Sequence, residues 1–346
     1  MIVSSLYLWR TTAKPIADLQ SSLVSAQTEA STGRFADIGS ALGAKTSLSI
    51  DLRNVLNRAT VEIEQNGLAA SELDVVQNSM TNLVDVAHSF VGTLIGSRNA
   101  LNGQAQVKDS AKNALAQMQN ILNVTQNGKA LFGGINSSAA PLSDYLGTPS
   151  SPAKAAVDAA FLAQFGFTQS DPSVANISAA QMDSFLSGSF ADLFNSANWS
   201  ANWSTASSQN SKIRVDNNLK VDVTTNANDS AFRNMAMAFT MVMDLGAGSL
   251  SQAAFEKLVD KATTIASSAV TATTNIAGQL GNVQKLLADQ NVRLNQRNDT
   301  INQQLQRLEG VDQAEVATRI NMLMTQLETS YSLTARINKL SLLNYL

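Results

Sequence analysis

The stretch "AASELDVVQNSMTNLVDVAHSFVGTL", residues 69–94, decides the fold, because its apolar residues recur at alternating steps of three and four. They are Ala69, Leu73, Val76, Met80, Leu83, Ala87, Phe90 and Leu94. This spacing is typical of a helix that buries one narrow seam against another helix. It predicts a helix from about Ser47 to Arg98, which at about 1.5 Å per residue would be roughly 75 Å long. Such a helix needs a partner alongside it.

Similar spacing occurs in further blocks toward both ends of the chain. The blocks begin with Ile16, Leu19, Leu23, Ala26 and Ala30, and continue with Val107–Ile121, Leu258–Ile276, Leu280–Leu287 and Val316–Leu327. Four of the five prolines lie between Pro141 and Pro172, so helix is uninterrupted by proline over most of the chain. The economical arrangement pairs the first blocks with the last. The alternative is several short helices whose seams face one common core.

We therefore predict a mainly α fold, in which the N- and C-terminal segments form a long antiparallel coiled-coil or helical-bundle rod that carries a small inserted α+β domain. The expected parts are a terminal coiled-coil assembly domain (1–46 with 305–346), a helical rod domain (47–135 with 229–304) and an outer domain (136–228).

The middle of the chain has a different pattern. "KIRVDNNLKVDV", residues 212–223, alternates apolar and polar residues around Asn217-Asn218 and predicts a β-hairpin. Residues 155–167 and 178–194 are expected to form short helices, the second with Ser178 as its N-cap. The chain is expected to return to a long helix at Asp229 or Ser230.

Composition gives little indication of catalysis. The 346 residues carry a net charge of -3, contain no cysteine and include one histidine, His88. The weak charge excludes a basic field for nucleic acid, and His88 has no second His or Cys with which to share a metal. "LFGG", residues 131–134, lacks the spacing of a dinucleotide loop and predicts a helix stop and turn. We predict no enzymatic activity, no cofactor and no metal.

Two of the three tryptophans, Trp199 and Trp203, lie four residues apart in the repeat "NWSANWS". On a helix they would share a face and could contact a sugar or another ligand of the outer domain. The interpretation that we favour places them in the core of that domain.

Both ends of the chain are expected to carry the function. Fourteen of the last 31 residues are Val, Ile, Leu, Met or Tyr, and one helix packed on one side would leave many of them exposed. Ends of this kind can be ordered by pairing with each other and with further copies, although they could also dock on their own domain. The predicted assembly residues are Leu6, Tyr7, Ile16, Leu19, Leu23, Val316, Ile320, Leu323, Leu327, Leu333, Ile337, Leu340, Leu343, Tyr345 and Leu346.

Several segments resemble the bacterial flagellins and hook-associated proteins. The N-terminal run ends in Ser31-Thr32-Gly33-Arg34, which is similar to the turn that closes the family's first helix. "NGKALFGGIN" (127–136) resembles the turn into the family's outer domain, and residues 227–245 resemble the segment of return. The final 24 residues resemble the family's C-terminal helix. The "LFGG" turn and the Leu-Asn-Tyr-Leu ending are most similar to the hook–filament junction proteins (hook-associated protein 3), whereas the family's Asp-Asp-Pro element is missing after the first turn.

This resemblance implies a structural subunit of the bacterial flagellum that joins hook to filament through its terminal helices. The implied partners are copies of itself, the adjacent axial proteins (hook-associated protein 1 and flagellin) and an export chaperone on the C-terminal helix. The resemblance also implies an extracellular protein that leaves the cell by type III export without a cleaved signal peptide. No nucleic acid and no membrane insertion are expected. The alternatives are a filament flagellin and a flagellin-like surface protein that binds polysaccharide.

Overall fold

The computed structural model describes residues 5–100, 102–216 and 219–343. The chain is mainly α, as predicted, and its contacts divide it into two compact units. The terminal unit comprises Met1–Ile63 with Val292–Leu346, and the central unit comprises Glu64–Asn291. The three parts expected from the sequence, 1–46 with 305–346, 47–135 with 229–304, and 136–228, stay a prediction.

The longest helices follow the sequence pattern closely. They are α1 (Ser5–Thr32), α3 (Thr46–Ser97), α4 (Gly103–Leu122), α9 (Ser230–Asp244), α10 (Gln252–Glu309) and α11 (Gln313–Leu343). The shorter helices are α2 (Ile38–Leu42), η1 (Gly43–Lys45), α5 (Pro152–Phe165), η2 (Pro172–Asn176), α6 (Ala179–Ser187), α7 (Ser189–Asp192), α8 (Ser196–Asn202) and η3 (Ala247–Ser249). The strands are β1 (Thr125–Gln126), β2 (Lys129–Ala130), β3 (Lys212–Asp216) and β4 (Leu219–Asp222).

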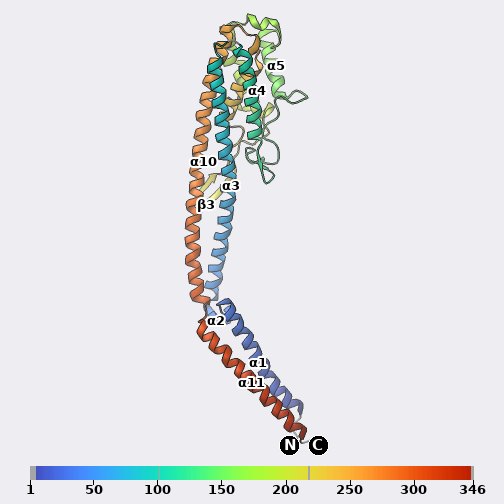
Figure 1. Ribbon diagram of the computed structural model, residues 1–346, viewed down its shortest axis with the longest axis vertical. Coiled ribbons are helices and arrows are strands. Elements are labelled where there is room, and N and C mark those ends of the chain that lie inside the picture. The colour runs from blue at the N-terminus through green and yellow to red at the C-terminus, as the bar shows by residue number, and fades with distance from the viewer. Residues whose placement is uncertain (1–4, 101, 217–218, 344–346) are drawn as a thin grey trace. The chain divides into compact units, whose positions relative to one another are not determined.

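In the terminal unit, α1 and α11 form the antiparallel pair that the spacing predicts (Figure 1). Gln20 of α1 donates to the Tyr331 hydroxyl at 2.7 Å, and Glu29 pairs with Arg319 at 3.0 Å, so the start of one helix lies beside the end of the other. Ala26 is buried on α1, and Val316, Leu323 and Leu327 are buried on α11. These residues confirm the predicted step of three and four.

In the central unit, α3 runs antiparallel to α10 (Figure 1). All eight apolar residues of the 69–94 seam are buried, with Leu73 to Leu94 at most 1% exposed. Helix α9 packs on α4, and its Phe239 ring meets that of Phe90 edge-on at 4.9 Å. The buried seam of α3 therefore contributes to one hydrophobic core together with α9 and the adjoining helices.

A polar pair crosses between α3 and α10. Asn66 is 3% exposed, and its amide donates to the side-chain oxygen of Asn291 at 2.8 Å. A polar pair at a helix seam can fix the alignment of two helices, because any shift would leave the buried Asn66 amide without a partner, although Asn291 is half-buried.

Asn66→Ala is expected to lower the free energy of unfolding by about 1–2 kcal/mol, because one buried hydrogen bond is lost. Asn78→Ala on the same helix serves as the control, since Asn78 is exposed and should tolerate the change. Urea unfolding followed by circular dichroism compares the two variants. Equal midpoints would contradict a role for the pair.

The inserted segment leaves and re-enters the helices at neighbouring points. Gly133 forms a β-bridge with Asn226, and the Ala227 amide donates to the Phe132 carbonyl at 2.8 Å. Gly134 has φ +63°, and a Cβ there would lie 2.4 Å from the Ser207 carbonyl oxygen. The "LFGG" stretch is thus a turn, as predicted, and its second glycine is required by both backbone angle and space. The helix stop predicted at this stretch is wrong, because α4 already ends at Leu122 and the short hairpin of β1 and β2 precedes the turn.

The predicted hairpin is present: β3 pairs with β4 in antiparallel register, from Lys212 opposite Asp222 to Asp216 opposite Leu219. Its turn, Asn217-Asn218, lies outside the described residues. The short helices α5 to α8 gather an aromatic cluster that extends from Phe161 to Trp203. The Ser178 cap is also confirmed, because its hydroxyl accepts from the Gln181 amide.

Candidate assembly surface

The predicted assembly residues of the terminal unit fall into three groups. Val316, Leu323 and Leu327 are buried between α1 and α11, and Ile16, Leu19, Leu23, Ile320 and Ile337 are half-buried. Leu333 is 58% exposed. The side chains of Leu6, Tyr7, Leu340 and Leu343, together with Tyr345 and Leu346, lie outside the described residues.

Helix α11 presents apolar side chains on both sides of its buried row. Met322 and Leu333 are 53% and 58% exposed, and at about 100° per residue both lie roughly 90° to one side of the row. Met324 and Tyr331, 47% and 50% exposed, lie a similar angle to the other side. We call these the Met322 flank (Met322, Leu333) and the Tyr331 flank (Met324, Tyr331). A helix with one packing partner needs a single apolar stripe, so the two flanks leave apolar area for further neighbours.

A groove of about 520 Å³ borders the Met322 flank. Leu19 of α1 and Met322 of α11 line it, together with the short polar side chains Thr325, Thr329 and Ser330 and with Gln326. Its residues carry no formal charge, so a neighbouring helix could enter it without desolvating an ion.

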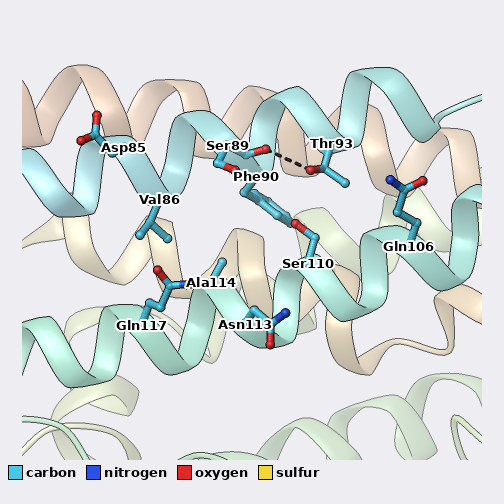
Figure 2. Close-up of a pocket in the computed structure, with 10 residues that line it drawn as sticks. All are labelled: Asp85, Val86, Ser89, Phe90, Thr93, Gln106, Ser110, Asn113, Ala114 and Gln117. Atoms are coloured by element: carbon cyan, nitrogen blue, oxygen red, sulfur yellow. Dashed lines mark hydrogen bonds between the residues drawn. The ribbon is translucent and has the colours of Figure 1, made fainter.

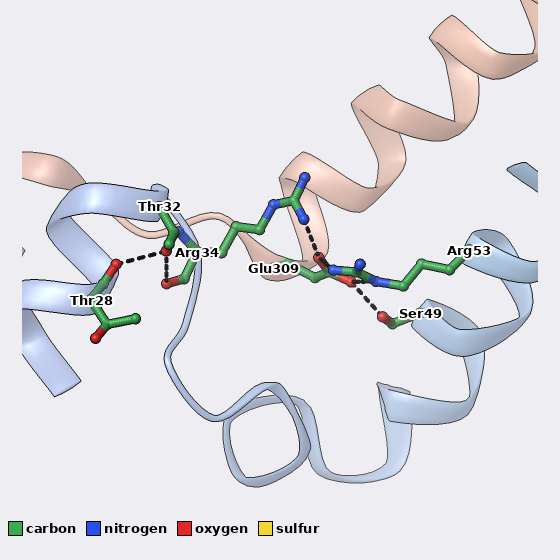
Figure 3. Close-up of polar contacts among 6 residues, drawn as sticks. All are labelled: Thr28, Thr32, Arg34, Ser49, Arg53 and Glu309. Carbon is green, nitrogen blue, oxygen red and sulfur yellow. Dashed lines mark hydrogen bonds and ion pairs between the residues drawn. The ribbon is translucent and has the colours of Figure 1, made fainter. Parts of the chain in front are cut away.

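A polar cluster fixes the terminal unit where α1 ends and α11 begins (Figure 3). The Glu309 side chain is fully buried, accepts from the Ser49 hydroxyl at 2.5 Å, and is paired with Arg53 through both carboxylate oxygens. Arg34 approaches the same carboxylate at 3.9 Å. Burial alone would raise the pKa of Glu309, but the hydrogen bonds from Arg53 and Ser49 and the charges of Arg53 and Arg34 hold that pKa below its ordinary value.

The backbone beside Glu309 explains the Ser-Thr-Gly-Arg turn. Gly33 has φ +71°, so it closes α1 in the left-handed conformation that glycine adopts most easily. The Phe35 amide then donates to the Glu309 carbonyl at 2.9 Å, and the Val311 amide donates to the Gly33 carbonyl at 3.1 Å. This turn is therefore the place where the two terminal segments are joined by main-chain hydrogen bonds.

Glu309 was not among the residues predicted from the sequence, although its position carries a signal. Ile301 and Leu305 are buried, and Glu309 continues their step of four as a charged residue at a seam position. A lone charge on a seam indicates a buried ion pair. Its partners could not be named, because Arg53 lies 256 residues away in the sequence.

A second groove, of about 500 Å³, lies between α3 and α4 in the central unit (Figure 2). Polar side chains from both helices line it, among them Ser89, Thr93 and Asn113. Asp85 is the charged residue of the lining. The histidine, His88, is exposed on α3. Within residues 5–100, 102–216 and 219–343, no group of three or more His, Cys, Asp or Glu is placed to hold a metal.

Trp199 and Trp203 are buried, with 0% and 2% of their surface exposed. Their rings stack on each other at 5.0 Å, Trp203 also stacks on Tyr145, and the Trp199 indole donates to the Ala227 carbonyl. Neither ring offers a free face to a ligand in this structure, because the aromatic cluster of the central unit covers both.

Both ends of the chain match models of a known protein family, whereas the middle does not. Residues 3–137 match the bacterial flagellin N-terminal helical region, and residues 263–346 match the bacterial flagellin C-terminal helical region. The chain belongs to the flagellin family. The two matches together cover well over half of it and contain both α1 and α11. The segment of return at 227–245 lies outside them. No curated protein matches the chain.

Membership of the flagellin family makes this protein a structural subunit of the flagellum that polymerises into extracellular flagellar assemblies. Among the described helices of this flagellin-family chain, none is both long enough and apolar enough to cross a membrane.

Proposed function

We propose that this flagellin-family subunit is the junction protein that joins hook to filament. The observation that carries its assembly role is the pair of apolar flanks on α11, which one chain alone leaves exposed. In the assembled flagellum, copies of the chain cover these flanks, and the terminal helices form a coiled-coil layer. The fifteen predicted assembly residues, Leu6 to Leu23 and Val316 to Leu346, belong to this layer.

The sequence supports the junction role over the filament role at two places. The "LFGG" turn at residues 131–134 and the Leu-Asn-Tyr-Leu ending at 343–346 resemble the hook-associated junction proteins more than the filament flagellins. The neighbours of the chain are then hook-associated protein 1 on the hook side and flagellin on the filament side. Before export, the amphipathic α11 is the site for a chaperone, which would cover the same exposed apolar flanks.

Filament flagellin is the second candidate, because both family regions that match the chain carry the description of flagellin. The two candidates differ in self-assembly. A filament subunit elongates without limit from a seed, whereas a junction subunit stops after a small number of copies.

Deletion of the gene followed by electron microscopy distinguishes the candidates. For a junction protein, we expect bare hooks and flagellin released into the medium, with filaments restored by the gene supplied in trans. For a filament flagellin, we expect bare hooks and no such released subunit. Ordinary filaments in the deletion strain, with no duplicate gene, would contradict both roles.

A further inference from the structure

The central unit contains a hollow of about 750 Å³ that the assembly role does not use. Residues of α4, of α5 and of the end of α9 line it, and we call the α9 part its floor because Met243 there is the buried residue of the lining. Residues 168–170 and 246–249 form the rims. Its volume falls within the range of sites that hold small molecules or a few sugar rings.

The rims of the hollow are held in place. The Gln169 amide donates to Asp158 of α5 at 2.8 Å, which ties one rim to a helix. On the other rim, Gly246 has φ +71°, and a Cβ at this position would lie 3.0 Å from the Gln169 carbonyl oxygen and from Val174. The two rims therefore pack closely enough to preform the site.

The floor carries a carboxylate that is only partly used. Asp244 accepts from the Tyr145 hydroxyl at 2.5 Å and pairs with Lys154 at 3.2 Å, and both contacts fall on Oδ2. Within the described part of the chain, both side-chain contacts of Asp244 leave its Oδ1 unused, and 16% of the side chain is exposed. Lys154 is already engaged by Asp244 and Asp158. The floor thus offers an acceptor and no spare cation.

The lysines of the hollow that form no ion pair among the described residues belong to α4. Lys108 and Lys112 are one helical turn apart, line the hollow and are exposed. Neither forms an ion pair with any residue that the structure describes. Asp109 is their one acidic neighbour on α4 and is not paired with either of them, so the two ammonium groups together still attract an anion. Their spacing suits the two oxygens of one carboxylate or two neighbouring acidic groups.

We propose that this hollow binds an acidic carbohydrate, whose carboxylate pairs with Lys108 and Lys112 and whose hydroxyl groups donate to Oδ1 of Asp244. The exposed hydroxyls of Thr168 and Ser249 complete the contacts to the sugar, and Leu146 covers an apolar ring face. A neutral sugar would leave both lysines unused, and a simple anion such as phosphate would pair with the lysines without supplying sugar hydroxyls to Asp244, Thr168 and Ser249. The combination of a carboxylate floor and a lysine wall therefore selects a ligand that carries both hydroxyls and an acid group.

Calorimetric titration of the purified full chain with trigalacturonate tests this inference. Binding is expected for the unmodified protein and is expected to weaken about tenfold in the double variant Lys108→Gln with Lys112→Gln. Both substitutions are at exposed positions on the same helix, and circular dichroism confirms that the variant stays folded. The matched control is Lys129→Gln with Lys220→Gln, two exposed lysines of the same unit outside the hollow, and it should bind as the unmodified protein does.

Two further probes separate the sugar from the charge. Maltotriose, a neutral sugar of equal length, should not bind, and inorganic phosphate should not displace trigalacturonate at equal concentration. The inference is overturned if trigalacturonate does not bind, if it binds the double variant as tightly as the unmodified protein, or if either probe binds equally well. Because the assay uses the unassembled chain, its outcome is independent of the junction role.

Discussion

Met322→Ser together with Leu333→Ser is expected to abolish assembly while leaving the α1–α11 pair folded. Both side chains are more than half exposed in the single chain, so their removal costs the isolated protein little. In the assembly they become buried against a neighbour, and the apolar area still available on the two is worth about 3 kcal/mol. This corresponds to roughly a hundredfold in the association constant at every copy of the contact.

The measurement combines swimming in a complemented deletion strain with electron microscopy of its hooks. The control variant, Leu162→Ser with Leu219→Ser, removes two side chains of comparable exposure (48% and 43%) from the part of the chain that neither family region matches. We expect filaments with the control and bare hooks with the flank variant, at equal levels of secreted protein. Normal filaments with the flank variant would exclude the Met322 flank from the assembly contact.

Glu309→Ala is expected to destabilise the terminal unit by about 2–3 kcal/mol. The carboxylate is fully buried, and its removal eliminates the contacts with Ser49, Arg53 and Arg34 in one step. This loss is smaller than the cost usually seen for a broken buried ion pair, because the Arg53 side chain is 39% exposed and can be solvated by water. The main-chain bonds from Phe35 and Val311 depend on the same turn and should weaken with it.

Hydrogen exchange of the unassembled chain measures this effect. Faster exchange is expected in residues 29–53 and 306–320, with little change in the central unit. Glu328→Ala is the matched control, because Glu328 is an exposed acid of α11 that forms no ion pair within the described residues. Equal protection in the two variants would mean that Glu309 does not hold the two terminal segments together.

The same carboxylate gives the terminal unit a dependence on pH. Its pKa is lower in the folded protein than the ordinary 4.5, so the folded state favours the ionised form. The stabilisation is therefore complete above the ordinary value and is lost as pH falls through the folded pKa. Protection of residues 29–53 should decline in that acidic range in the unmodified chain, and Glu309→Gln should remove this contribution to the decline.

The sequence alone determined the helical framework of this protein. Apolar steps of three and four predicted α3 to within one residue at each end and predicted the seam of the α1–α11 pair. The alternation of apolar and polar residues predicted the hairpin of β3 and β4. The "LFGG" stretch was also predicted as a turn, because backbone angles open to glycine are a local property. The turn at Ser31–Arg34 was expected from its resemblance to the family. The period of the apolar residues shows which face of a helix or strand is buried, so these elements can be predicted from the sequence without knowing their partners.

Only the tertiary structure decided which polar groups meet and which apolar groups stay uncovered. Glu309 and Arg53 are 256 residues apart, and Tyr145 and Asp244 are 99 apart, so no local pattern links them. The burial of Trp199 and Trp203 likewise depends on Tyr145 and Ala227, which reach them through the fold. An apolar seam determines that a helix packs against another helix. How the two helices are placed in space then determines which flanks stay exposed and which side chains meet.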